Sequence, residues 1–356
     1  MDEISLLEGL LKIYSPSDHE AEAVNYLVAQ MQAAGLEAFV DPAGNAVGMI
    51  GDGPQTVMLL GHIDTVPGFI PVKRDGDKLY GRGAVDAKGP LACFVASTAR
   101  AGTLRHPSTA LRTGAQGAGR RLVVIGAVGE EGNSPGARYA KDQYRPAFTI
   151  IGEPSGWEKI TLGYKGTMWF EYRVKRPLAH TSTKSESACE AAVGFWNRVI
   201  AWTDQFNLGK ERMFEQVTPT LRGMTSDSDG FVESATLTLN LRLPPSVNVE
   251  TANETMCGLL TQAELELLDA VPAYRAEKNT PLVRAFLGGI RKAGGTPSFS
   301  LKTGTADMNI VAPVWGTPIV AYGPGDSTLD HTAEEHILIS EYQKAIEVLT
   351  EVLVTL

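Results

Sequence analysis

The sequence predicts an α/β protein of two domains, in which an α/β domain is interrupted by a smaller, inserted α+β domain. Over residues 1–163, apolar runs alternate with amphipathic segments, as in folds that alternate strands and helices. Residues 164–276 instead combine long helical patterns with strict apolar–polar alternation, and residues 277–356 return to the first style. The 356 residues exceed one ordinary domain and suffice for two.

The first domain opens with two helices and three strands. Apolar spacing and turn residues set their ranges: helices over 3–14 and 20–35, then strands over 37–40, 46–50 and 56–61. Ser17 or Asp18 is expected to cap the second helix, and Gly35 to end it. The run from Val57 to Leu60 is apolar throughout, which is typical of a strand buried on both faces.

The same domain continues with a helix over 90–101 and strands over 122–127 and 148–151. Residues 102–120 are rich in Gly, Ser, Thr and Arg and lack an apolar period. We therefore expect a surface insertion there.

The inserted domain is predicted as strand, helix, strand, helix, strand around one sheet, and we expect a small α+β domain of the ferredoxin-like kind. Its elements cover residues 168–174, 185–203, 235–243, 249–264 and 265–273. The first domain then resumes with a helix from Asn279 and Thr280 to about Ala293. Two short strands and a closing helix follow, over 297–301, 318–321 and 337–353.

Composition argues against two classes of protein. The net charge of −9 and the pI near 5.3 disfavour nucleic-acid binding, which needs clustered Lys and Arg. No stretch approaches the roughly 20 apolar residues of a membrane span, and residues 1–11 lack the pattern of a signal peptide. Three scattered cysteines are expected to be reduced and buried, which favours the cytoplasm.

Acidic and imidazole side chains follow the predicted buried strands. His62 and Asp64 lie two residues apart after the first of these strands, so in an extended chain their side chains point the same way. This pair suits a metal ligand and its orienting partner. A lone histidine that packs at a strand end is the alternative.

The segment Gly81-Arg82-Gly83-Ala84-Val85-Asp86 contains glycines at a spacing that suggests a dinucleotide-binding loop. Asp86 stands where the third glycine of that motif is required, so the match fails. The segment is better interpreted as a tight turn that presents Asp86, whose two oxygens could bridge two metal ions. A turn aspartate bonded only to its own backbone is the alternative.

Four further acidic or imidazole residues follow three later strands. Glu130 and Glu131 are adjacent carboxylates that would repel each other unless a cation or a proton intervened, and a solvated surface pair is the alternative. Glu153 follows the next strand, and His331 lies in a loop after the strand over 318–321. Ligands gather at the carboxyl ends of strands in open α/β sheets, and mixed His and carboxylate donors favour zinc or a similar divalent ion.

Taken in order, these motifs resemble the zinc-dependent aminoacylases, a group that includes acetylornithine deacetylase, succinyl-diaminopimelate desuccinylase and glutamate carboxypeptidase. The resemblance covers nearly the whole chain, and Gly129 is a departure where many members carry Asp. It implies two Zn²⁺ ions per chain, which Co²⁺ can replace. His62 and Glu153 would hold one ion, Glu131 and His331 the other, and Asp86 would bridge them.

The resemblance also implies roles for residues that are not ligands. Asp64 would orient His62, and Glu130 would act as the general base in hydrolysis of an amide bond. His180 would reach the active site of a partner subunit as an oxyanion donor, which implies a homodimer paired through the inserted domains. Arg242 and Thr305 would bind the substrate, the arginine through a carboxylate.

Within this group the chain is most similar to hydrolases that release lysine or ornithine from the amino-group carrier protein LysW. Ser15-Pro16-Ser17, Asn45-Ala46-Val47-Gly48 and the segment 302–309 support that placement. The alternatives are an N-acetylornithine deacetylase or a succinyl-diaminopimelate desuccinylase with the same chemistry, and a non-catalytic binding protein of the same fold.

Overall fold

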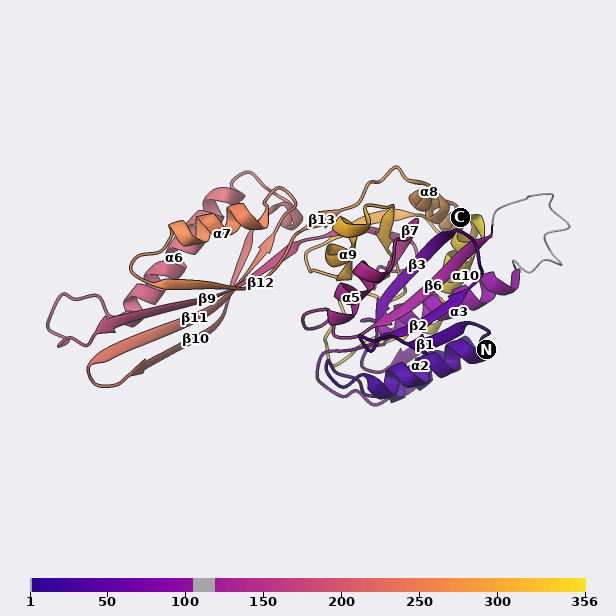
Figure 1. Cartoon of the computed structure of the whole chain (residues 1–356), viewed down its shortest axis with the longest axis horizontal. Coiled ribbons are helices and arrows are strands. Elements are labelled where there is room, and N and C mark those ends of the chain that lie inside the picture. Colours follow the sequence, from indigo (N-terminus) through magenta and orange to yellow (C-terminus); the bar gives the residue numbers. More distant parts are fainter. Residues whose placement is uncertain (1, 105–118) are drawn as a thin grey trace. The chain divides into compact units, whose positions relative to one another are not determined.

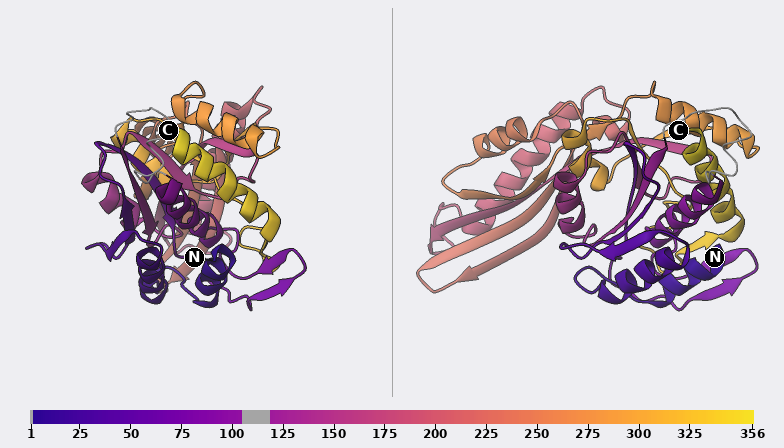
Figure 2. Two further views of the ribbon diagram at one scale, coloured as in Figure 1. Left: turned by 90° about the vertical axis from the view of Figure 1, so that its right-hand side faces the viewer. Right: turned by 45° about the vertical axis from the view of Figure 1, so that its right-hand side comes forward.

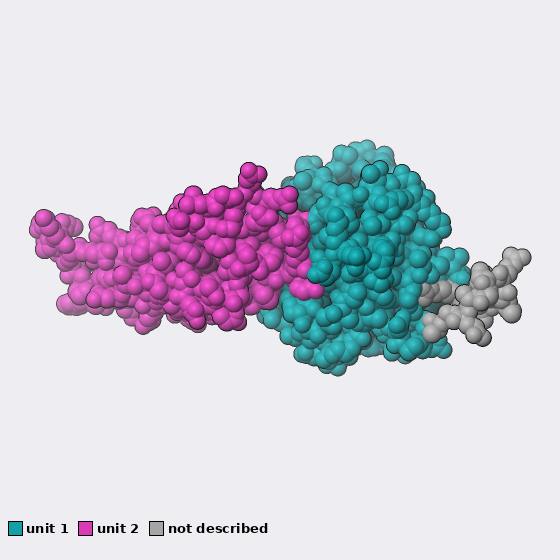
Figure 3. All heavy atoms as spheres, turned by 90° about the horizontal axis from the view of Figure 1, so that it is seen from above, with its two compact units in different colours: residues 1–163, 276–300, 306–356 teal, residues 164–275, 301–305 magenta. Residues whose placement is uncertain are grey.

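A computed structural model describes residues 2–104 and 119–356 of the chain. The chain forms two compact units, which Figure 3 colours separately. Unit 1 comprises residues 1–163, 276–300 and 306–356, and unit 2 comprises residues 164–275 and 301–305. The two units are described in turn.

Unit 1 is built on a nine-stranded sheet of mixed direction. Its strand order is β1-β2-β6-β3-β7-β15-β8-β13, and β14 pairs with β8. The strands are β1 (Glu37–Val40), β2 (Ala46–Ile50), β3 (Gln55–His62), β6 (Arg120–Ala127), β7 (Phe148–Gly152), β8 (Lys159–Tyr164), β13 (Tyr274–Arg275), β14 (Ser298–Lys302) and β15 (Ile319–Ala321). The predicted apolar strands are therefore confirmed, and β3 runs parallel to both β6 and β7.

Helices cover both faces of this sheet, which confirms the α/β class (Figures 1 and 2). They are α1 (Glu3–Lys12), α2 (Ala21–Ala33), α3 (Lys88–Leu104), α5 (Pro135–Gln143), α8 (Pro281–Lys292), α9 (Asp307–Trp315) and α10 (Ile339–Thr355). Helix α10 packs against α3 and α8, and α5 packs against α9 on the opposite face. None of the helices in the described parts is long and apolar enough to cross a membrane.

Several boundaries differ from the sequence prediction in unit 1. Helix α3 continues to Leu104 and β6 begins at Arg120, so the predicted insertion is shorter than 102–120, and residues 105–118 lie outside the described residues. The closing helix begins at Ile339 because residues 336–338 form β16, which pairs with β5. Strands β4 (Lys73–Asp75), β5 (Lys78–Tyr80) and β16 (His336–Leu338) make a small antiparallel sheet.

Unit 2 is a four-stranded antiparallel sheet, in the order β10-β11-β9-β12, that packs on two helices. Its elements are β9 (Gly166–Pro177), α6 (Ala188–Asn207), β10 (Thr218–Ser228), β11 (Val232–Leu243), α7 (Val249–Gly258) and β12 (Glu264–Val271). The predicted helix over 249–264 is too long, because Glu264 already belongs to β12. Strand β10 was not predicted, because most of its residues face solvent and its apolar pattern is weak.

Two of the three cysteines contradict the expectation of burial. Cys93 is buried in α3, but Cys189 and Cys257 are exposed on α6 and α7. All three are free thiols, as expected.

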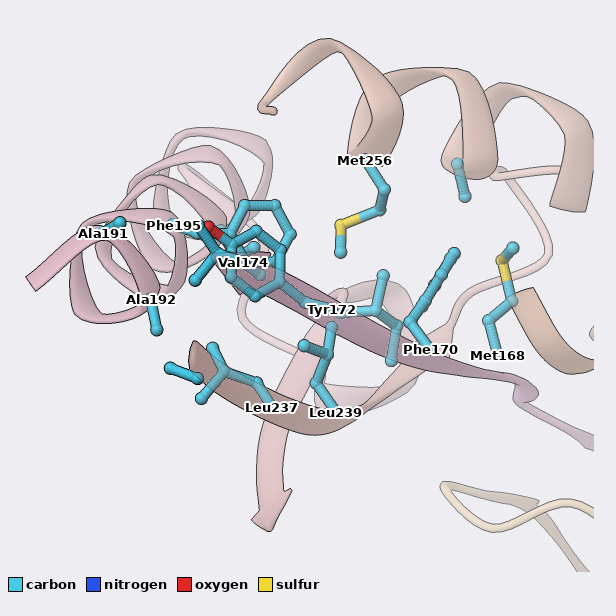
Figure 4. Close-up of a cluster of buried hydrophobic side chains, with 14 of the residues drawn as sticks. Met168, Phe170, Tyr172, Val174, Ala191, Ala192, Phe195, Leu237, Leu239 and Met256 are labelled. Carbon is cyan, nitrogen blue, oxygen red and sulfur yellow. The ribbon is translucent and has the colours of Figure 1, made fainter. Parts of the chain in front are cut away.

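The core of unit 2 lies between its sheet and α6, as Figure 4 shows. Phe195 stacks on Tyr172 with ring centroids 4.3 Å apart, and both side chains are fully buried. Phe195→Ala is expected to cost about 3–5 kcal/mol of unfolding free energy, because it leaves a cavity beside Tyr172. Chemical unfolding measures this, with Val193→Ala on the exposed side of α6 as the control. A loss no larger than the control's would contradict the packing described here.

Candidate active site

Four neighbouring parallel strands of unit 1, β6, β3, β7 and β15, end at the same edge of the sheet. His62 is the last residue of β3, Glu153 directly follows β7, and Glu130 and Glu131 follow β6 by a short turn. The strand ends thus place the predicted side chains at one edge, as the sheet topology requires.

Asp86, Glu131 and His331 form the centre of this site. Each offers one ligand atom, and these atoms lie within 4.8 Å of one another. His331 Nε2 lies 3.1 Å from Asp86 Oδ2 and 3.0 Å from Glu131 Oε1. His62 Nε2 lies 3.1 Å from the other oxygen, Asp86 Oδ1. The carboxylate of Asp86 therefore stands between two imidazoles, with one oxygen toward each.

Asp64 connects His62 to the pair of glutamates. His62 Nδ1 lies 3.0 Å from the backbone oxygen of Asp64 and 3.4 Å from its Oδ1. The fully buried carboxylate also accepts the backbone N–H of Glu130 at 3.0 Å and that of Glu131 at 3.1 Å. Asp64 thus fixes the ring of His62 and the turn after β6 together.

Ser17 belongs to the same network. Its hydroxyl donates to Asp64 Oδ2 at 2.7 Å. The prediction that Ser17 or Asp18 caps the second helix is wrong, because that helix has Glu20 at its N-cap position and no side-chain cap. A serine before a helix is a common cap, and nothing local distinguishes it from one that reaches a residue 47 positions away.

Gly129, the departure from the family pattern, has a physical reason. Its φ of +72° lies in the left-handed region, where a side chain is strained. A Cβ atom at this position would also lie 2.7 Å from Cδ of Pro135. In this chain the turn that presents Glu130 and Glu131 therefore requires glycine.

Burial and crowding of carboxylates govern the electrostatics of the site. Burial, together with the charges of Glu153, Asp307 and Glu131, raises the pKa of Glu130 well above its usual range, against the opposing effect of His62. Burial would lower the pKa of His62, but hydrogen bonds to Asp64 and Asp86 outweigh it and raise that pKa. Hydrogen bonds to Asp86 and Glu131 raise the pKa of His331 to about 10.

Asp307 is a site residue that sequence reasoning missed. It opens α9, is 3% exposed, and its Oδ1 has no hydrogen-bond partner among the described residues. Burial raises its pKa to about 6, although His62 and a hydrogen bond to Ser134 act against that rise. Asp307 lies in the segment 302–309 that supported the resemblance, but only Thr305 was selected from that segment.

These residues fit a divalent metal centre. Imidazole nitrogens and carboxylate oxygens are the donors that zinc and similar ions take, and three of them already converge on one point. Burial and the charges of neighbouring carboxylates raise the pKa of both Glu130 and Asp307, and Asp307 Oδ1 has no hydrogen-bond partner among the described residues, so the site holds an excess of acidic groups. Bound cations would relieve that excess.

Three predicted residues lie in unit 2. Arg242 Nη1 donates to Thr305 Oγ1 at 2.7 Å, and Thr305 Oγ1 donates to the backbone oxygen of Lys165 at 2.9 Å. Lys165 is fully buried, and burial beside the charge of Arg242 lowers its pKa to about 8. His180 lies in an exposed loop, where its Nδ1 accepts the backbone N–H of Ser182 at 3.2 Å.

The fold and the donor set define a metal-dependent hydrolase. The sequence profile of Peptidase family M20/M25/M40 matches residues 58–355, and the chain belongs to this family. It is thus an enzyme that hydrolyses amide bonds, as the sequence motifs predicted.

Relatives of known name agree with that membership. The chain is 44% identical to the [LysW]-lysine hydrolase of Deinococcus radiodurans, covering 99% of this chain and 96% of the relative. It is 39% identical to a putative [LysW]-lysine/[LysW]-ornithine hydrolase of Thermococcus kodakarensis, covering 99% and 91%.

Solved structures share the fold. The metallo-carboxypeptidase Sso-CP2 of Sulfolobus solfataricus, described as an M20 family member, superposes with a TM-score of 0.76 at 19% identity, over 99% of this chain and 98% of that one. Aminopeptidase PepT of Bacillus cereus gives a TM-score of 0.76 at 17% identity, over 99% and 97%.

Proposed function

We propose that this enzyme binds two Zn²⁺ ions and releases lysine or ornithine from the carrier protein LysW by hydrolysing a γ-glutamyl amide. The observation that carries the substrate is the 44% identity, over 99% of this chain, to a [LysW]-lysine hydrolase. The reaction adds water across the amide, frees the amine of the amino acid, and leaves the glutamyl carboxylate on the carrier.

The proposed ligands are His62 and Glu153 for one ion and Glu131 and His331 for the other, with Asp86 between them. The placement of Asp86 between two imidazoles supports a bridging role. When bound, the two cations would acidify a water molecule and polarise the scissile carbonyl. Glu130 would take a proton from the attacking water and pass it to the leaving amine. Asp64 holds the turn that carries Glu130 through its hydrogen bond to the backbone N–H.

His180 is proposed as the donor to the oxyanion, from the partner subunit of a homodimer. Its Nδ1 accepts the N–H of Ser182, so the neutral ring carries its proton on Nε2. That leaves an N–H donor available for a developing negative charge.

Mixing two inactive variants tests this shared site. His180→Ala and Glu130→Gln subunits are each expected to be nearly inactive alone, and a mixture is expected to recover activity, because some mixed dimers contain one intact site. Ser182→Ala mixed with Glu130→Gln is the control for an effect of mixing itself, because Ser182→Ala removes a contact to the ring of His180 but keeps that ring. Recovery no greater than the sum of the separate variants would refute the shared site.

Arg242 is proposed to bind the carboxylate of the substrate. Its guanidinium donates to Thr305 Oγ1 at 2.7 Å, and a guanidinium has the planar geometry for a two-pronged contact with a carboxylate. Arg242→Lys is expected to raise KM more than it lowers kcat, because a point charge cannot replace a two-pronged contact.

Assays of zinc-loaded enzyme on two substrates test the proposed function. Release of lysine from γ-glutamyl-lysine on LysW is expected, with little release from N-acetylornithine, and a chelator is expected to abolish it. The opposite preference would identify a deacetylase and overturn the proposed substrate. Zinc content below one equivalent per chain, with no effect of chelator, would indicate a binding protein.

A further inference from the structure

We propose that Arg82 and Glu335 form a buried clamp that sets the separation of Asp86 and His331, and so positions the metal centre; this rests on the proposed two-metal function. Neither residue is among the proposed ligands. Arg82 lies in the glycine-rich segment before Asp86, and Glu335 lies four residues after His331.

Glu335 holds the backbone of the turn that presents Asp86. It is 1% exposed, and its Oε1 accepts the N–H of Val85 at 2.9 Å and that of Asp86 at 3.2 Å. Its own backbone oxygen accepts the N–H of Gly81 at 3.4 Å, beside the pairing of β16 with β5. One side chain and its backbone thus hold both ends of the segment 81–86.

Arg82 joins the same carboxylate to the loop of His331. It is 8% exposed, and its Nη1 lies 2.8 Å from Glu335 Oε2 and 3.2 Å from the backbone oxygen of Thr332, which follows His331. Its Nε donates to the backbone oxygen of Gly68 at 2.9 Å. The guanidinium therefore bonds three acceptors, one at Gly68 and two in the segment 332–335.

A buried ion pair by itself gives little net stability, because desolvation offsets most of the attraction. The contacts of this pair instead fall on two backbone segments, one before Asp86 and one after His331. They hold at a fixed distance two side chains that contact each other at 3.1 Å. Residues that support metal ligands in this manner typically change metal affinity 10–100-fold when they are replaced.

Arg82→Lys separates a clamp from a simple charge. Lysine keeps the positive charge opposite Glu335 but cannot bond all three acceptors. The metal-free protein is titrated with Co²⁺, and binding is followed by visible absorption. The ion assigned to Glu131 and His331 is expected to bind roughly 10–100-fold more weakly, with an altered spectrum. The other ion is expected to change less than about threefold, because His62 and Glu153 are not tied to Arg82.

Glu335→Gln tests the other half of the clamp. Glutamine keeps one side-chain oxygen, but its N–H groups would face the N–H donors that the Glu335 carboxylate accepts. The turn of Asp86 is therefore expected to shift, and both ions are expected to bind more weakly. Arg100→Lys is the matched control for Arg82→Lys, since Arg100 pairs with Glu3, away from the site residues. Thermal unfolding of each metal-free variant reports its folding independently of metal.

Wild-type affinities and spectra in both folded variants would overturn the clamp. If Glu335→Gln fails to fold, Arg82→Lys decides alone. Failure of the wild-type protein to bind two ions would instead refute the proposed metal centre, so the two failures are distinguishable.

Discussion

Glu130→Gln is expected to lower kcat by at least about 100-fold, the usual scale for loss of a general base, while metal content stays near that of the wild type. Glu130 lies partly buried among carboxylates, and desolvation and their charges raise its pKa well above its usual range in the metal-free chain. Bound cations would restore its charge and make it a base close to the attacking water. Glutamine keeps the shape but cannot accept a proton.

Glu131→Gln is the matched comparison, because it changes the adjacent residue in the same turn. Glu131 contacts His331 at 3.0 Å, and its replacement is expected to release metal. Steady-state kinetics at saturating metal, together with zinc analysis of dialysed protein, measure both effects. Equal loss of metal in the two variants would contradict their different roles.

Asp86→Asn is expected to have the largest effect on metal binding. The two oxygens of Asp86 contact His62 and His331 at 3.1 Å each. Asparagine would keep an oxygen toward one of these rings and place its NH₂ group toward the other. The affinity for both ions is expected to fall more than about 100-fold, beyond the range typical of residues that only support a ligand. Activity would be lost with the ions.

Titration calorimetry with Zn²⁺ measures this loss, and Asp75→Asn serves as the control. Asp75 is an exposed aspartate of unit 1 that pairs with Lys73 at 3.6 Å. Retention of either ion with unchanged affinity in Asp86→Asn would exclude the bridging position.

The sequence predicted the edge of the sheet where the site lies. Buried parallel strands are continuous apolar runs, so the ends of β3, β6 and β7 were visible from the sequence, and the charged residues directly after them stood out. His62, Glu130 and Glu153 were therefore found by position alone. Asp86 and His331 were singled out from a glycine-rich turn and from a loop after a predicted strand, neither of which has a periodic signal, and the family resemblance then implied their roles.

Contacts between distant parts of the chain were not predictable in this way. Glu335 looks like an ordinary charged residue before a helix, and its burial depends on Arg82, 253 positions earlier. Ser17 has the local pattern of a helix cap. Strand β10 exposes most of its residues, and its pairing with β11, rather than any alternation of its own, makes it a strand.

The hydrogen bonds of Asp64 have a consequence for how the protein is made. Its carboxylate receives donors from Ser17, 47 positions before it, and from Glu130, 66 positions after it, and the last proposed ligand is His331. A growing polypeptide on the ribosome therefore lacks a complete ion-binding pocket until nearly all of its length has emerged. Capture of metal by the proposed donors would thus be deferred to the finished enzyme.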